Sequence, residues 1–140
     1  GMKEMISEKL KQHVKESEGL RLMPYLCPAG KLTIGYGHNI EDNGIPMVIA
    51  IDLLEIDLGV AQDELFSAFP AYKTLTQNRI DALIDMSFNL GIARLKKFKR
   101  MHKAIADHDY EIAARELMDS HYASQVGKRA EKNRDLIISG

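Results

Sequence analysis

Residues 18–38 read EGLRLMPYLCPAGKLTIGYGH and carry the clearest signals for local structure in the chain. Two short extended runs, LRLMPYL and KLTIGYG, flank the tetrapeptide CPAG. Pro28 fixes one turn dihedral angle, and Gly30 can adopt a positive φ, as a tight turn requires. The stretch therefore predicts a β-hairpin with a turn of three or four residues.

Glu18 opens this stretch at the end of a predicted amphipathic helix. Ile6, Leu10 and Val14 repeat at four-residue steps among charged residues, and Gly19 is a typical C-terminal stop. A carboxylic acid held partly buried at this place could stay protonated and donate a proton. The alternative is an ordinary solvated glutamate at a helix end, which is the more common case.

Cys27 is the only cysteine of the chain, and it lies on the predicted turn. A thiol there could act as a nucleophile, as a base or as a group that holds water, or it could be a small, half-buried apolar side chain. Paired with His38, it could also form a peptidase dyad. The nucleophile of such peptidases normally opens a helix whose dipole lowers its pKa, and a hairpin turn supplies no such field.

The segment TIGYGH contains a Gly-x-Gly pattern, Gly35 and Gly37, which is not followed by a third glycine or a helix start. A dinucleotide fingerprint is therefore excluded, and the glycines indicate close backbone approach to another strand or to a ligand chain. The five histidines lack the spacing of a metal site, so neither a metal nor another cofactor is expected.

The rest of the chain is predicted to be helical. A long apolar segment begins at Pro46 and ends before Pro70, and four further helices are expected over residues 77–90, 95–106, 110–120 and 127–138. The predicted class is α+β, mainly α. A single domain over 1–140 would comprise a helix and hairpin lobe (1–45), a connecting helix (46–70) and a helical lobe (71–140).

Composition is that of a globular protein, with 45% hydrophobic and 28% charged residues among 140. The N-terminal residues lack the apolar segment of a signal peptide, and no run of about 18 apolar residues occurs, so a cytoplasmic location is expected. Residues 1–70 hold 6 Lys/Arg against 11 Asp/Glu, whereas residues 94–134 hold 11 against 6. The basic part could attract an anionic polymer such as a bacterial wall or nucleic acid, although solvated helix faces are the simpler explanation.

The pattern Glu-x8-Cys-x5-Thr, formed by Glu18, Cys27 and Thr33, closely resembles the catalytic segment of phage-type lysozymes, glycoside hydrolase family 24. The following residues match that segment in register: Glu18, Gly19, Arg21, Tyr25, Thr33, Gly35, Gly37 and His38. The resemblance continues in DALIDMSFNLG, which is similar to the family's central buried helix, and in SHYASQVGKRAEKNR, where Tyr122 stands at a position that is often Trp. Many members carry Asp in place of Cys27, and the region between hairpin and long helix is shorter here.

The resemblance implies a lysozyme-like fold and an endolysin-type muramidase. Such an enzyme hydrolyses the β-1,4 bond between N-acetylmuramic acid and N-acetylglucosamine in peptidoglycan, with inversion of configuration. By the same resemblance, Glu18 is the general acid, Thr33 holds the attacking water and Cys27 replaces the second carboxylate. Arg129 is expected to pair with Glu18, and His38 with Asp57, as structural supports.

The implied partner is the glycan strand of peptidoglycan, with neither nucleic acid nor membrane as a ligand, and the implied state is a monomer. Without a signal peptide, the enzyme would wait in the host cytoplasm and depend on a separate holin-type pore protein to reach the wall. Two alternatives remain open: a wall-binding protein of lysozyme fold with little activity, and a Cys27/His38 peptidase that cuts peptide stems.

Overall fold

The computed structural model describes the backbone of residues 2–140 and the side chains from residue 4 onward. The chain divides into two compact units, Gly1–Ile51 and Asp52–Gly140, which we call the N-terminal and C-terminal units. The first contains the strands and the second is helical, which confirms the predicted α+β, mainly α class. The single domain over residues 1–140 stays a prediction.

The N-terminal unit begins with the 3-10 helix η1 (Met2–Met5) and helix α1 (Glu8–Glu18). Ser7 caps α1, since its Oγ accepts the N–H of Leu10 at 3.0 Å. The helix ends at Gly19, as predicted, where φ is +73° and the N–H donates to the Lys15 carbonyl. Glu18 is therefore the last helical residue before the sheet.

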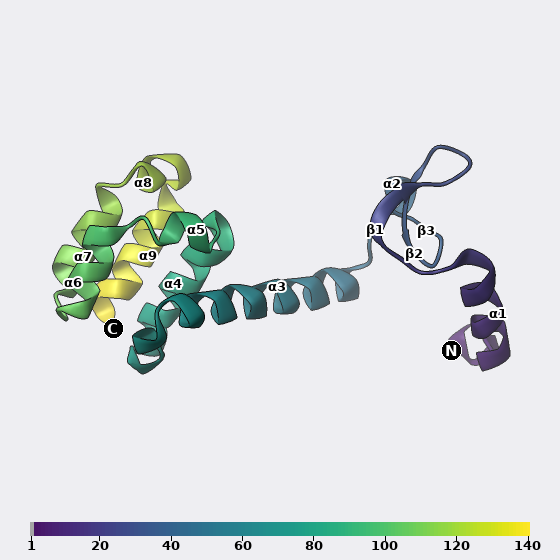
Figure 1. Ribbon diagram of the computed structural model, residues 1–140, viewed down its shortest axis with the longest axis horizontal. Coiled ribbons are helices and arrows are strands. Elements are labelled where there is room, and N and C mark those ends of the chain that lie inside the picture. Colours follow the sequence, from purple (N-terminus) through teal and green to yellow (C-terminus); the bar gives the residue numbers. More distant parts are fainter. Residues whose placement is uncertain (1) are drawn as a thin grey trace. The chain divides into compact units, whose positions relative to one another are not determined.

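Three antiparallel strands follow in the order β1 (Arg21–Leu26), β2 (Leu32–Gly35) and β3 (His38–Asn39) (Figure 1). The β1–β2 pair is the predicted hairpin. Beyond the last strand pair, Leu26 with Leu32, the N–H of Cys27 donates to the Lys31 carbonyl at 3.0 Å, which leaves a turn of three residues, 28–30, as predicted. Gly30 has the predicted positive φ, +78°, and its N–H donates to the Cys27 carbonyl at 2.8 Å.

The short strand β3 and the helix α2 (Ile40–Asn43) were not predicted. Asn39 begins α2, because its Oδ1 accepts the N–H of Asp42 at 3.0 Å. Gly44, with φ +58°, ends it. Elements of two and four residues are too short to carry a periodic apolar pattern, so composition alone did not reveal them.

Helix α3 (Met47–Ala68) matches the predicted long helix, and the 3-10 helix η2 (Pro70–Thr74) follows it. Helices α4 (Gln77–Leu90), α7 (Tyr110–Met118) and α9 (Lys128–Ser139) also lie where the sequence predicted helices. Asp109 caps α7, since its Oδ1 accepts the N–H of Ile112 at 3.2 Å.

The single helix predicted over residues 95–106 is wrong. The structure has α5 (Ile92–Leu95) and α6 (Lys99–Ala106), joined by a turn in which the N–H of Phe98 donates to the Leu95 carbonyl at 3.1 Å. The break turns the Phe98 ring edge-on to Tyr122, with 6.0 Å between ring centroids. Tyr122 belongs to α8 (His121–Val126), a helix that was also not predicted.

The core of the C-terminal unit lies among α4, α6, α7 and α9, with α7 against both α6 and α9 (Figure 1). Its largest fully buried side chains are Leu65, Leu83, Met86, Leu95, Met101, Leu117, Tyr122 and Ile137. Removing these apolar groups from water is the main stabilising contribution of the unit. Within the described residues, no helix combines the length and the apolar character needed to cross a membrane.

Candidate active site

Glu18 lies against Gly37, in the turn between β2 and β3. A Cβ placed on Gly37 would stand 2.8 Å from Glu18 Oε2 and 3.0 Å from its Cδ, closer than side chains pack. Gly37 also has φ +78°, a backbone conformation that favours glycine. The Glu18 side chain is exposed. The N-terminal unit therefore does not provide the partial burial that was expected for it.

Cys27 is half-buried, and hydrogen bonds lower the pKa of its thiol below the usual 9.0. The backbone of Lys31 is the main cause. Desolvation opposes it, and the backbone of Ala29, the side chain of Thr33 and the backbone of Cys27 itself add smaller lowering effects. The thiol and Thr33, two of the predicted site residues, are therefore neighbours. The lowered pKa makes the thiolate, the form that carries charge, more accessible.

Thr33 is almost fully buried, with 3% of its surface exposed. Its hydroxyl donates to the Lys31 carbonyl at 2.8 Å. A hydroxyl has one hydrogen, so Thr33 donates either to the Lys31 carbonyl or to the Cys27 thiolate, and in both cases its oxygen can accept a hydrogen bond from a water. A water that donates to Thr33 Oγ1 keeps its own lone pairs available, which is the orientation an attacking water needs.

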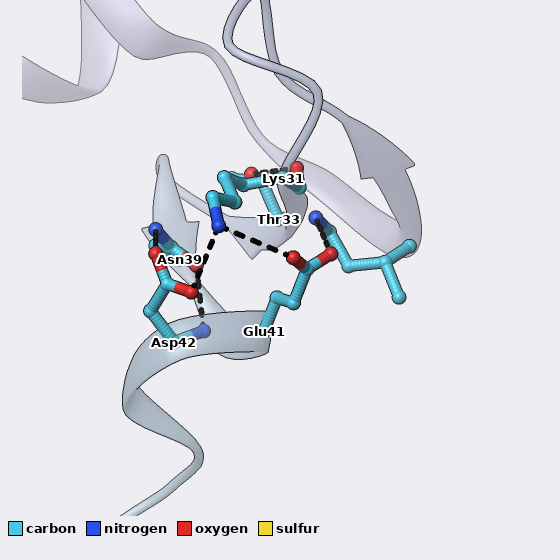
Figure 2. Close-up of polar contacts among 6 residues, drawn as sticks. Lys31, Thr33, Asn39, Glu41 and Asp42 are labelled. Atoms are coloured by element: carbon cyan, nitrogen blue, oxygen red, sulfur yellow. Dashed lines mark hydrogen bonds and ion pairs between the residues drawn. The ribbon is translucent and has the colours of Figure 1, made fainter.

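An ionic cluster braces the β-strands that carry Thr33 (Figure 2). Lys31 Nζ lies 3.5 Å from Glu41 Oε2 and 3.2 Å from Asp42 Oδ1, and Glu41 Oε1 accepts the N–H of Leu32 at 3.1 Å. Asn39 holds Asp42 from the other side, donating Nδ2–H to Oδ2 at 3.0 Å. The cluster thus ties α2 to the start of β2. Because the side chains are partly exposed, the cluster adds little to the free energy of unfolding, and its main effect is to fix the position of β2.

His38 forms a hydrogen bond through Nε2 with the Gly44 carbonyl at 2.6 Å. A carbonyl only accepts, so Nε2 carries the hydrogen and His38 uses it within its own loop. Among the described residues, the groups that hydrogen-bond the Cys27 thiol are the backbones of Lys31, Ala29 and Cys27 itself and the side chain of Thr33, and His38 is not one of them. The Cys27/His38 dyad of a peptidase is therefore not formed.

Arg129 in the C-terminal unit is held by Asp85. The guanidinium donates to both carboxylate oxygens, with distances of 2.9 and 2.7 Å. Burial raises the pKa of Asp85, but the hydrogen bonds from Arg129 and Asn133 and the Arg129 charge outweigh it and leave that pKa below its usual value. Hydrogen bonding to Asp85 in turn raises the pKa of Arg129.

Asn133 extends this pair into the core. Its Nδ2 donates to Asp85 Oδ2 at 2.9 Å and to the Tyr122 hydroxyl at 3.0 Å, and both Asn133 and Tyr122 are buried. Arg129 thus has a fixed direction on the surface of its unit. The predicted pairs Glu18–Arg129 and His38–Asp57 each join residues of the two units and stay predictions.

The sequence revealed Gly37 only as a point of close backbone approach, and it did not reveal Glu41 or Asp85. The GYG pattern was the signal for Gly37, where the close approach comes from a side chain rather than from a strand. Asp85 gave no signal, since its partners Arg129 and Asn133 lie 44 and 48 residues away. Across the described residues, no group of three or more His, Cys, Asp and Glu side chains could hold a metal ion.

The family model of phage lysozyme matches residues 15–134. An endolysin of Acyrthosiphon pisum secondary endosymbiont phage 1 is 36% identical over 126 residues, covering 89% of this chain and 85% of the relative. A probable T4-type lysozyme 2 of Dictyostelium discoideum is 29% identical and covers 94% of both chains. An endolysin of Bacillus phage PZA is 35% identical over 59% of this chain and 34% of its own. The chain belongs to the phage lysozyme family and is a lysozyme, a hydrolase of peptidoglycan.

Proposed function

We propose that this enzyme cleaves the β-1,4 bond between N-acetylmuramic acid and N-acetylglucosamine with inversion, and that Glu18 is its general acid. The proposal rests above all on the placement of Glu18, whose carboxylate is seated on Gly37 beside the hairpin that carries Cys27 and Thr33. An acid on one side and water-orienting groups near it are the components that glycoside hydrolysis requires.

In the proposed reaction, the protonated Glu18 carboxyl gives its proton to the glycosidic oxygen as the bond to the anomeric carbon breaks. A water that donates a hydrogen bond to Thr33 Oγ1 attacks the opposite face of the sugar, which inverts the configuration. The Cys27 thiolate takes the place of the second carboxylate, supplying negative charge and accepting a proton of the water. Its lowered pKa supports this role.

Replacing Glu18 by Gln tests the assignment. The amide cannot donate the proton, and general-acid assistance is typically worth about a hundred- to ten-thousand-fold, so wall hydrolysis should fall by at least that factor. Glu16→Gln is the matched control, because Glu16 lies two residues away on the same helix and its contact among the described residues is a hydrogen bond that it accepts from Gln12 at 2.9 Å. Residual activity of Glu18→Gln within about tenfold of the wild type would remove Glu18 from its role.

The products distinguish the bond that is cut. New reducing ends on muramic acid identify a muramidase, new amines identify a peptidase, and binding without product identifies a wall-binding protein of low activity. Fast proton NMR of a chitooligosaccharide-like or wall fragment reports the anomer first released, and an α product from the β bond establishes inversion. A β product would contradict the inverting mechanism while leaving the muramidase assignment intact.

The proposal extends to the cell. We infer that the enzyme stays in the host cytoplasm as a monomer until a holin-type pore protein lets it reach the wall, as its relatives named endolysins suggest. Producing the enzyme in bacteria with and without such a pore protein tests this. Lysis should depend on the pore, and lysis by the enzyme alone would contradict the dependence.

A further inference from the structure

The turn between α5 and α6 and the start of α6 carry a concentrated positive charge. Residues 94–103 read RLKKFKRMHK, with six Lys/Arg and no acidic residue. We call the exposed side chains of this segment the α5–α6 basic surface: Arg94, Lys96, Lys97, Lys99, Arg100 and Lys103. Its apolar residues Leu95 and Met101 are buried, so the cations cover the outer side of an anchored segment.

Most of these cations form no ion pair within the part of the chain that the structure describes. Lys103 pairs with Asp107 at 2.8 Å, and Lys96 lines a hollow together with Asp63 and Glu64. Elsewhere among the described residues no ion pair is made by Arg94, Lys97, Lys99 or Arg100. Unpaired like charges on one face repel each other and lower stability, a cost that binding a counter-charge would relieve.

A hollow of about 490 Å³ adjoins three of them, Lys97, Lys99 and Arg100. Glu116 and Asp119 stand in the same lining. Their carboxylates would repel a small multivalent anion placed inside the hollow. An extended chain of anions that runs along α5 and α6 can contact several of the six cations at once, whereas a free phosphate contacts one or two, so the surface suits an extended polymer better than a free phosphate.

We propose that the α5–α6 basic surface binds the phosphodiester polymers attached to bacterial walls and thereby holds the enzyme on its substrate. This rests on the proposed function, which brings the enzyme to the wall. Polymers of this class carry one negative charge per repeat, and Lys and Arg side chains bind phosphate oxygens by charge-assisted hydrogen bonds. None of the six cations belongs to the catalytic residues, so retention and hydrolysis are separable.

Binding is measured with the Glu18→Gln variant, which leaves the wall intact, on walls before and after chemical removal of their phosphodiester polymer. In this background, K97Q/K99Q/R100Q is compared with K73Q/R115Q/K128Q, which removes the same charge from exposed cations on η2, α7 and α9. The first triple variant should lose roughly a hundredfold in affinity for untreated walls at low ionic strength, and the control far less. Both should bind stripped walls alike.

The same substitutions in the active enzyme should leave hydrolysis of stripped walls unchanged, which separates this proposal from the proposed function. Purified poly(glycerol phosphate) should compete for binding, whereas orthophosphate at equal phosphate concentration should not. Equal loss in both triple variants would overturn the proposal in favour of general charge attraction. Stronger binding to duplex DNA or to anionic phospholipid vesicles than to the wall polymer would also overturn it. The melting temperature of each variant is measured as a control for folding.

Discussion

Gly37 determines where the Glu18 carboxylate can lie, and this can be tested with a glycine from another turn of the same sheet, Gly30. Ala at a positive φ costs about 1–2 kcal/mol, so Gly37→Ala and Gly30→Ala, both at φ +78°, should lose similar stability. Only the Ala at residue 37 would press on Glu18, because a Cβ at residue 30 meets no atom of the described residues within 4 Å. We therefore expect Gly37→Ala to lose far more wall hydrolysis than Gly30→Ala. Equal losses of activity would show that the Glu18 placement is unimportant.

The proposed role of Cys27 predicts how the activity depends on pH. If it acts as a thiolate, activity should rise with pH through the thiol pKa, which the Lys31 backbone holds below 9.0. Cys27→Asp should keep or raise activity and lose this rise, since a carboxylate is already ionised at neutral pH. Cys27→Ser and Cys27→Ala should lose activity, because neither side chain ionises there. Initial rates from pH 5 to 9 measure the difference.

If Cys27→Asp, Cys27→Ser and Cys27→Ala all have the activity of the wild type, Cys27 has no catalytic role. The reaction would then need only Glu18 and a water held by Thr33. An inactive Cys27→Asp variant, together with complete inactivation of the wild type by iodoacetamide and loss of stem cleavage, would favour a peptidase.

At the scale of elements, Asp85 joins α4 to α9 through Arg129 and Asn133. Asp85→Ala should destabilise the enzyme by about 1–3 kcal/mol, chiefly because a buried Asn133 N–H loses its acceptor. The Arg129 pair adds less, since it is more than a third exposed. Arg129→Ala should also destabilise, and urea unfolding measures both losses.

Comparing the activities of these two variants addresses the predicted Glu18–Arg129 pair. Both changes break the bond between Asp85 and Arg129, but only Arg129→Ala removes the cation. A greater loss of activity in Arg129→Ala than in Asp85→Ala would support the pair, and matching activities would contradict it.

His102 links η2, α5 and α6 in one charge-sensitive contact. Its Nε2 donates to the Leu95 carbonyl at 2.7 Å, so Nδ1 accepts from the Tyr72 hydroxyl at 2.5 Å, and the ring stacks on Phe69. Burial lowers the pKa of His102 below 6.5, against a smaller opposing effect of the bond to Leu95. The folded protein therefore prefers the neutral ring.

The His102 ring binds a proton more readily in the unfolded chain than in the folded protein. The stabilising contribution of the neutral ring should therefore be fully present above pH 6.5. It should fall as the pH drops below 6.5 and continue to fall until the pH passes the lowered pKa, by at most about 1.4 kcal/mol per pH unit. Thermal unfolding of the wild type and His102→Gln between pH 5 and 8 tests this. An identical pH dependence in the two proteins would contradict a role for His102.

The sequence predicts an element when the residues that determine it lie within or next to that element, and it fails when they lie far along the chain. Helix α3 follows from Pro46 and the end of α1 from Gly19, because both residues act on the backbone of their own neighbours. The break after Leu95 contains neither glycine nor proline, and it accompanies the packing of Phe98 on Tyr122, far along the chain. The candidate site divides in the same way, because Glu18, Cys27 and Thr33 lie within one local motif while Asp85 meets its partners only after folding.

At the scale of the whole molecule, opposite charges are separated along the chain. Helix α3 carries five acidic residues and no basic one, whereas residues 94–103 carry six basic residues and no acidic one. The net charge is nevertheless −1, with an isoelectric point near 6.6. Interactions with other molecules therefore depend on the pattern of charge rather than on its sum.

This pattern has a consequence for the protein in solution. Near pH 6.6 no net repulsion keeps molecules apart, and the acidic α3 of one can approach the basic α5–α6 surface of another. At about 0.1 M salt such attraction is screened beyond about 10 Å. The lysozyme should therefore salt in: its solubility at the isoelectric point rises when electrolyte is added and falls on dialysis into water.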